Sequence, residues 1–251
     1  MFIDTHCHLS IEDYEDIDKV ILENREAGID KIIISGCSYN SIIESLELSN
    51  KYEDIYVTIG FHPDQVQNIT NDDIQFLKEK IKNKKVVGIG EIGLDYHYSK
   101  EFKDKQIQLF EEQLKIAEDL KLPVVIHSRD ATLDTINTLK KYKVRGVIHC
   151  FSGSLETAEI YISMGFYLGI GGVVTFKNSS LSDVIKKIGL SNVLLETDSP
   201  YLSPTPLRGT KNSSKNIPLI ADYLSSILNI SVDEVSKITL NNTYDLFDLK
   251  N

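Results

Sequence analysis

The sequence predicts an α/β fold, specifically a (β/α)8 barrel. Short apolar runs rich in β-branched residues alternate with helical patterns along the whole chain, which is typical of βα units around a parallel sheet buried on both faces. We count eight such runs. The chain has 251 residues, 41% of them hydrophobic, which is enough for the core of one α/β barrel. We therefore expect one domain over residues 1–251, which is simpler than two small domains.

The predicted elements follow one another without a linker or low-complexity tract. Strands are expected at residues 2–8, 31–35, 55–61, 86–92, 124–127, 146–149, 166–170 and 192–196, each followed by a helix-like segment. The clearest helices are 101–120, where apolar residues recur at helical spacing, and 217–227. The proline-rich stretch 200–206 predicts a long functional loop after the last strand. A final helix, about 232–241, is expected to pack outside the barrel.

Two histidines mark the end of the first predicted strand. His6 and His8 stand at i and i+2, so both rings point to one face of the strand and Cys7 points to the other. Such a pair can bind one cation, although a strand with two polar residues can also simply line a wet cavity.

Four further residues with metal-binding side chains lie at the ends of other predicted strands. Glu91 follows a glycine-containing strand that lets other groups approach closely, and its two oxygens can bridge a pair of cations. His127 and His149 close apolar strands, where each is either a metal ligand or a hydrogen-bonded core residue. Asp198 can ligate a cation and accept a proton from water, or merely cap the next helix.

These side chains are expected to converge, because the active site of a (β/α)8 barrel is assembled at the carboxyl ends of its strands. Four imidazoles and two carboxylates are about the right number of donors for two divalent cations with positions left for water. We therefore predict a two-metal site. The nitrogen-rich set favours zinc, manganese or iron over magnesium, and the choice among magnesium, manganese and zinc stays open.

Charge and composition limit the partners. The formal charge is −10, and two bound divalent cations would reduce it only to −6, so a nucleic-acid substrate is expected to be recognised locally, at a strand end, rather than along a duplex. No apolar run approaches about 18 residues and the first residues do not resemble a signal peptide, so we expect a cytoplasmic protein without a membrane partner. Cys7, Cys37 and Cys150 suit a reducing compartment and are expected to be buried thiols.

Taken together, the motifs resemble the TatD-type metal-dependent hydrolases, within the wider amidohydrolase-like barrels. The matching stretches are FIDTHCHL (2–9), GFHP (60–63), GIGEIGLDY (88–96), LPVVIHSRDA (122–131), HCFSG (149–153) and ETDSPYL (196–202). The resemblance implies that one cation is held by His6, His8, Glu91 and Asp198, and the second by Glu91, His127 and His149. It also implies that Asp198 accepts the proton.

The resemblance implies 3′-to-5′ digestion of DNA, and sometimes RNA, supported by magnesium; removal of D-amino acids from mischarged tRNA is also attributed to the family. The mechanism we expect is a bridging hydroxide held by two cations, oriented by Asp198, with the cations offsetting charge on the phosphoryl oxygens during in-line attack. The expected substrate is single-stranded DNA or a nucleic-acid end, and no obligate protein partner is inferred.

Several residues near the predicted strand ends are candidates for contacts with the substrate. His62, Arg129 and Arg208 are predicted to contact phosphate, with His97 and Lys211 as weaker candidates, but each also suits an ordinary loop or surface ion pair. Tyr96 and Tyr201 either stack on a terminal base or pack internally. The family commonly shows RGKRNEP after the long loop, whereas residues 208–214 read RGTKNSS. The absence of the Glu-Pro puts the contacts there in doubt.

Two rival functions remain open. The first is hydrolysis of an amide, lactone or ester by a sister barrel, in which a modified lysine often bridges the cations; here Glu91 occupies the corresponding position, although a carboxylate can serve amide hydrolysis as well. The second is a non-catalytic, metal-bound module that binds nucleic acid or protein.

Overall fold

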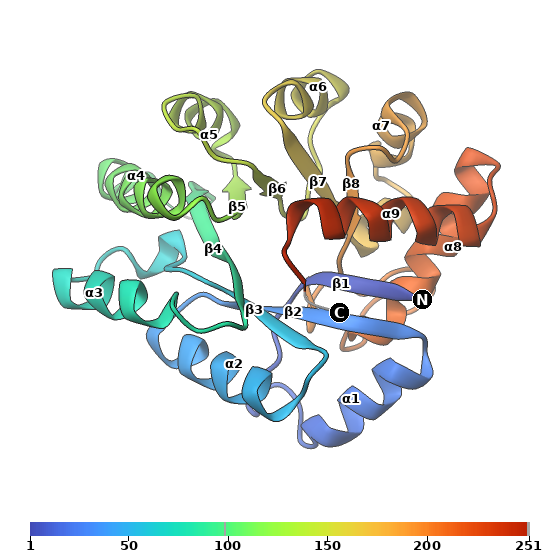
Figure 1. Ribbon diagram of the computed structural model, residues 1–251. Coiled ribbons are helices and arrows are strands. Elements are labelled where there is room, and N and C mark those ends of the chain that lie inside the picture. Colours follow the sequence, from blue (N-terminus) through green and yellow to red (C-terminus); the bar gives the residue numbers. More distant parts are fainter. Residues whose placement is uncertain (98, 250–251) are drawn as a thin grey trace. The chain divides into compact units, whose positions relative to one another are not determined.

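The structure is a computed structural model that describes residues 1–97 and 99–249. Strands and helices alternate along the chain, and the parallel strands follow one another in the sheet in chain order, from β1 to β8 (Figure 1). This is the expected (β/α)8 fold. The chain divides into two compact units, Met1–Ile34 with the chain from Cys150 onward, and Ser35–His149.

The first unit contains the first and the last strand of the barrel. Its elements are β1 (Phe2–Cys7), α1 (Ile17–Glu26), most of β2 (Ile29–Gly36), α6 (Leu155–Ser163), β7 (Phe166–Ile170), the 3-10 turn η2 (Gly172–Thr175), α7 (Leu181–Ile188), β8 (Val193–Leu195), η3 (Ser214–Asn216), α8 (Ile217–Leu228) and α9 (Val232–Leu246). β1 pairs with β2, and β7 with β8, in parallel register. The Thr5 hydroxyl donates to the Leu195 carbonyl at 3.0 Å, which ties β8 to β1.

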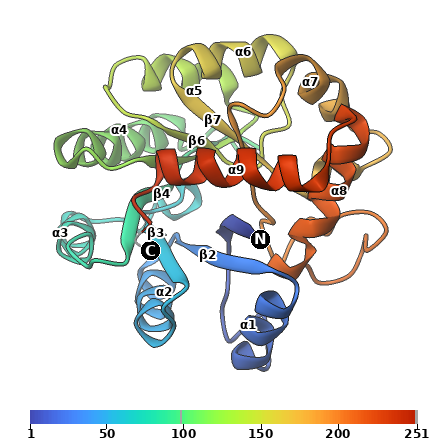
Figure 2. The same ribbon diagram turned by 45° about the vertical axis from the view of Figure 1, so that its right-hand side comes forward.

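Helix α9 covers the amino-terminal ends of β1 and β8. The Asn242 side chain donates to the carbonyls of Leu190 and Val193 at 2.7 and 2.9 Å, and the Ser236 hydroxyl donates to the Met1 carbonyl. In both views α9 runs beside α8 (Figures 1 and 2). These contacts lie at the start of the strands, so α9 packs at the end of β1 and β8 opposite to their carboxyl ends.

The second unit contains α2 (Tyr39–Lys51), β3 (Ile55–Ile59), η1 (Pro63–Gln65), α3 (Asn71–Lys80), β4 (Val86–Asp95), α4 (Lys103–Leu120), β5 (Val124–Arg129), α5 (Thr132–Leu139) and β6 (Gly146–Ile148). β3, β4, β5 and β6 pair successively in parallel. Gly93, with φ of +150°, lets β4 approach β5 so closely that an added Cβ would lie 1.9 Å from the His127 carbonyl oxygen. A side chain at this position would separate the two strands that carry Glu91 and His127.

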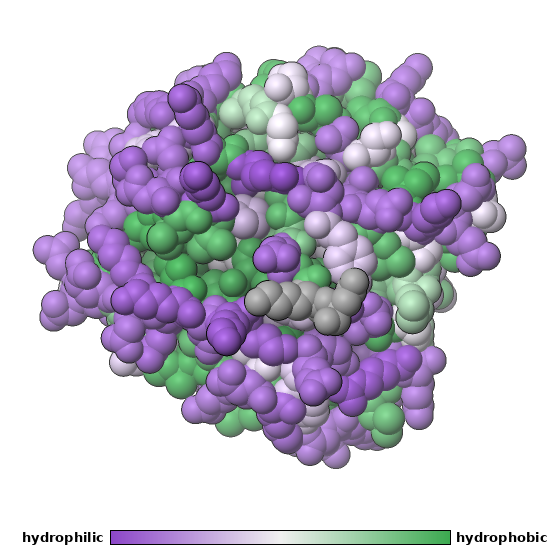
Figure 3. All heavy atoms as spheres, viewed as in Figure 1, coloured by the Kyte–Doolittle hydropathy of each residue, from purple (hydrophilic) through white to green (hydrophobic). Residues whose placement is uncertain are grey.

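Burial follows the expected pattern. Every residue of β1, β3, β6 and β8 is buried, as a sheet covered on both faces requires. Hydrophilic side chains predominate on the face shown in Figure 3, which agrees with helices that turn charged sides outward. In the described residues, no helix is both long enough and apolar enough to cross a bilayer.

Some predicted strands and helices end at other residues than the observed ones. β4 continues to Asp95, three residues beyond the predicted end, because β5 pairs with it as far as Arg129. α9 extends to Leu246, since its last turns keep buried residues against the strands. The expectation of three buried thiols was wrong for Cys37 and Cys150, which are only half-buried because both lie in the connections that follow strands.

Candidate metal centre

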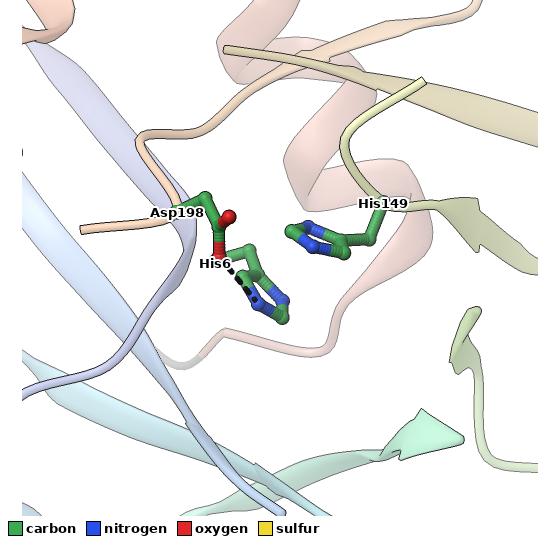
Figure 4. A group of neighbouring side chains, drawn as sticks. All are labelled: His6, His149 and Asp198. Carbon is green, nitrogen blue, oxygen red and sulfur yellow. Dashed lines mark ion pairs between the residues drawn. The ribbon is translucent and has the colours of Figure 1, made fainter. Parts of the chain in front are cut away.

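Three of the predicted ligands gather at the carboxyl ends of β1 and β8 in the first unit. Oδ1 of Asp198 lies 3.7 Å from Nε2 of His6 and 3.5 Å from Nε2 of His8. The two imidazoles lie edge to face with their centroids 5.1 Å apart. Figure 4 draws the His6–Asp198 pair as a dashed line. Cys7 turns the other way, with Sγ 3.8 Å from the Ile33 carbonyl, so the strand alternation places both histidines on one face.

The buried carboxylate of Asp4 connects the two backbone segments that carry His6 and Asp198. Asp4 is fully buried and accepts hydrogen bonds from the Thr197 amide at 3.0 Å and the Thr197 hydroxyl at 2.6 Å. It also accepts one from the His6 amide at 3.3 Å. Burial raises the pKa of Asp4 to about 7, although these hydrogen bonds act in the opposite direction. Asp4 thereby joins the backbones that carry His6 and Asp198.

Asp198 itself sits in the left-handed backbone region, with φ of 53°. Aspartate tolerates this region better than most residues, though less well than glycine. The turn is fixed on both sides, because the Asp198 amide donates to the His6 carbonyl at 3.0 Å and the His8 amide donates to the Ser199 carbonyl at 2.7 Å. The unusual conformation directs the carboxylate toward the two imidazoles.

Glu196 is a second buried acid on this side, and the sequence reasoning did not single it out. Its Oε1 accepts a hydrogen bond from the Cys150 amide at 2.6 Å. A Cβ added to Gly169 on β7 would lie 2.1 Å from Glu196 Oε2. Glycine at 169 therefore provides the space that this carboxylate occupies.

In the second unit, one carboxylate oxygen is surrounded by imidazoles. Oε1 of Glu91 lies 2.7 Å from Nδ1 of His127 and 3.7 Å from Nε2 of both His62 and His149. The Glu91 and His149 side chains are each only 5% exposed. One ligand atom from each of Glu91, His127 and His149 lies within 4.8 Å of the others. His149, drawn in Figure 4, follows β6.

Asp95 contacts the second ring nitrogen of His127. Its Oδ2 lies 3.0 Å from Nε2 of His127, so the imidazole spans two carboxylates, Glu91 and Asp95. Burial by itself would lower the pKa of His127, but the hydrogen bonds with Asp95 and Glu91 outweigh it and raise this pKa to about 9. For Asp95, burial is opposed by His127 and the His97 amide, which lower its pKa.

The predicted substrate contacts divide between two cavities. His62 and Arg129 line a cavity of about 390 Å³ together with Asp95 and His127. The His62 ring packs edge to face on His127, with centroids 4.4 Å apart, so His62 lies among the candidate metal-binding side chains. Arg208 lines a separate cavity of about 540 Å³ in the first unit.

The weaker candidates occupy more ordinary positions. Tyr96 is buried and its hydroxyl donates to Asp134 at 3.1 Å, which indicates packing. His97 is exposed and lies 2.9 Å from Asp130, and Lys211 donates to the Asp13 carbonyl. Tyr201 is 59% exposed, with its ring centroid 6.3 Å from that of His8. Of these residues, only Tyr201 has an exposed ring beside the candidate ligands.

The sequence reasoning missed Asp4, Asp95 and Glu196. Strand alternation provided a signal for two of them, because Asp4 is two residues before His6 and Asp95 is four residues after Glu91. Asp95 was overlooked because the predicted strand ended at residue 92. The role of Glu196 depends on the space above Gly169, which has no local sequence signature.

The donor set fits divalent cations. Imidazole nitrogens and carboxylate oxygens are the common ligands of zinc and manganese. Asp95 hydrogen-bonds to His127, and such a carboxylate partner orients the imidazole and fixes its tautomer.

The chain is similar to a known protein family over nearly its whole length. The family described as TatD-related DNase matches residues 3–248. The chain is 38% identical to YabD of Bacillus subtilis over 98% of this chain and 99% of that protein, and 33% identical to YcfH of Escherichia coli over 98% and 96%. Both relatives bear the name uncharacterized metal-dependent hydrolase.

Solved structures agree over the whole length. The crystal structure of YjjV, a TatD homologue from Escherichia coli, superposes with a TM-score of 0.92 at 32% identity and covers 99% of this chain and 98% of that one. A TatD family hydrolase from Entamoeba histolytica gives a TM-score of 0.88 at 26% identity, with the same coverage. A lactonase from Deinococcus radiodurans shares only the fold, with a TM-score of 0.66 at 12% identity.

Proposed function

The chain belongs to the TatD-related DNase family of metal-dependent hydrolases, and from this premise we propose that it is a 3′-to-5′ exodeoxyribonuclease that uses two divalent cations. The observation that carries the proposal is the buried Glu91 oxygen with imidazole nitrogens of His62, His127 and His149 within 3.7 Å. A carboxylate in such surroundings is suited to bind a cation.

We assign His6, His8 and Asp198 to one cation and Glu91, His127 and His149 to the other. That Glu91 also contributes to the first cation is carried over from the family resemblance. Bound divalent cations supply Lewis acidity, which offsets charge on phosphoryl oxygens and makes water a better nucleophile at neutral pH.

The protein's own groups would position the reactants and move the proton. Asp198 accepts the proton of the attacking water, and its carboxylate is aimed by the left-handed turn and by the Asp4–Thr197 hydrogen bonds. The hydrogen bond to Asp95 fixes the His127 ring. Single-stranded DNA ends are the proposed substrate, because the net charge of −10 disfavours a long duplex contact.

The test is digestion of a 3′-end-labelled single-stranded DNA by chelator-stripped protein, with magnesium, manganese or zinc restored in turn. We expect stepwise loss of the label that requires the metal and disappears in Glu91→Ala, together with loss of metal retention. Glu79→Ala is the matched control, since Glu79 is an exposed carboxylate on α3 in the same unit, and it should digest like the wild type.

Two outcomes would overturn the proposal. Full activity in Glu91→Ala would remove Glu91 from the reaction. Absence of digestion with all three metals, combined with metal-dependent hydrolysis of a lactone, an amide or a D-aminoacyl-tRNA ester, would assign the site to the rival hydrolase chemistry.

A further inference from the structure

The cavity beside Arg208 is lined by basic residues, although the chain as a whole is acidic. It has a volume of about 540 Å³, within the range of roughly 300–1,000 Å³ that is usual for small-molecule sites. Lys177 and Arg208 line it, and no carboxylate does. In the described part of the chain, neither the Lys177 ammonium nor the Arg208 guanidinium has a carboxylate partner. In a protein with a net charge of −10, such a cavity attracts anions.

Arg208 is held in a defined orientation. Its guanidinium carbon lies 3.5 Å from the centroid of the Phe176 ring, so one face of the guanidinium is stacked on the aromatic ring. Stacking uses the face of a guanidinium and not its N–H groups, which lie in its plane and match the oxygens of a phosphate. Ser180 also lines the cavity, and its side chain carries a hydroxyl, a group that can act as a neutral donor.

The two loops that form the cavity are fixed to each other. Thr205 donates through its amide to the Thr175 hydroxyl at 2.8 Å and through its hydroxyl to the Thr175 carbonyl at 3.2 Å. Gly172 allows a still closer contact, because a Cβ there would lie 2.2 Å from the Leu202 carbonyl oxygen. The cavity is therefore preorganised, which limits the ordering cost of binding.

The cavity opens at the same end of the first unit as the candidate ligands. Phe176 and Lys177 follow η2, which begins two residues after the end of β7, and Arg208 belongs to the loop that begins at the end of β8 and contains Asp198. A single loop therefore carries both Asp198, where the cleaved phosphate of a nucleic-acid strand would lie, and Arg208. A positively charged groove that follows the backbone is a usual means of holding single-stranded nucleic acid.

We propose that Lys177 and Arg208 form a subsite for a phosphate of a single-stranded nucleic acid other than the phosphate that is cleaved. This inference rests on the proposed nuclease function and names where the uncleaved part of the strand binds. The test separates the two claims, because binding is measured with a phosphorothioate DNA octamer, which resists hydrolysis, on metal-loaded protein.

Fluorescence anisotropy at several salt concentrations gives the affinity and its salt dependence for Lys177→Ala, Arg208→Ala and the double variant. Each single substitution is expected to raise Kd roughly 5- to 10-fold and to reduce the slope of log K against log salt by about 0.7. Lys177→Arg should retain most of the affinity. Lys187→Ala, which removes an exposed lysine of α7 outside the cavity, should match the wild type.

A kinetic arm compares hydrolysis of an unmodified octamer with that of bis(p-nitrophenyl) phosphate, which is too small to reach a second subsite. The ratio of the two kcat/KM values should fall about 10-fold in the double variant and stay constant in Lys187→Ala. If Kd, salt slope and this ratio all match Lys187→Ala, the subsite is excluded. Competition by inorganic phosphate that depends on Lys177 and Arg208, without an effect of either on octamer affinity, would also exclude a nucleic-acid subsite.

If the octamer binds through Lys177 and Arg208 but no phosphodiester is hydrolysed with any metal, the proposed nuclease reaction is wrong while the proposed subsite is supported.

Discussion

The hydroxyl of Thr197 donates a 2.6 Å hydrogen bond to Oδ2 of Asp4, and this contact joins the first strand to the residue before Asp198. The contact lies in a fully buried position, where the carboxyl group has a pKa of about 7. Its protonation state therefore links the pH to the stability of the backbone around Asp198.

Asp4→Asn should change how stability depends on pH. The folded-state pKa is raised above the unfolded value of 3.8, so the folded protein binds more protons between pH 4 and 7, and this group's contribution is full below pH 4 and lost as the pH rises through 7. Relative to the neutral variant, metal-stripped wild type should lose on the order of 3 kcal/mol across this interval. Urea unfolding at pH 4.5 and 7.5 measures the difference; a constant difference would contradict the assignment.

Asp95→Asn should weaken metal binding without unfolding the protein. Asp95 fixes the His127 ring through Nε2, and loss of such a supporting carboxylate typically costs about 10- to 100-fold in metal affinity. Isothermal titration of stripped protein with zinc or manganese measures it. Asp134→Asn, which alters a carboxylate paired with Lys103 outside the cluster, is the control, and equal affinities in the two variants would remove Asp95 from this role.

Metal removal should lower the melting temperature. Ligand present at about 100 times its Kd stabilises a protein by about 2.7 kcal/mol, which for a chain of this size corresponds to a shift of roughly 5–10 °C. Differential scanning fluorimetry with and without chelator tests this. The increment should vanish in Glu91→Ala and persist in Glu79→Ala; an undiminished increment in Glu91→Ala would place the stabilising cation elsewhere.

Gly169→Ala should destabilise the first unit by displacing Glu196. The added methyl would lie 2.1 Å from the Glu196 carboxylate, and overpacking of this kind costs about 1–3 kcal/mol. Because the clash is with one side chain, a double-mutant cycle with Glu196→Ala should recover part of the loss. Additive free energies of unfolding would show that the methyl group meets something other than Glu196.

The sequence was most informative where strand periodicity and residue chemistry coincide. The H-x-H at the end of the first strand predicts two imidazoles on one face, and His6 and His8 both face Asp198. Alternation of apolar runs with helices predicted the (β/α)8 order, and the start of each strand was predicted within two residues.

What could not be predicted depends on distances between separate strands. Asp95 becomes relevant only because Gly93 brings β4 close to β5, and the sequence pattern shows neither the length of β4 nor its pairing. The packing of Arg208 on Phe176 joins two loops that are separated by a helix and a strand. Stacking of this kind leaves no periodic signal, so the sequence indicated only that Arg208 was a candidate.

The left-handed backbone at Asp198 has a consequence for how this chain responds to selection. Glycine adopts φ of 53° without the steric cost that any side chain carries, so the fold itself has no need of aspartate there. A directed-evolution experiment that rewards thermal stability alone would enrich glycine at position 198 and lose the proposed proton acceptor. Aspartate should persist only in libraries that are also screened for turnover, as expected for a residue whose conformation serves function at the expense of stability.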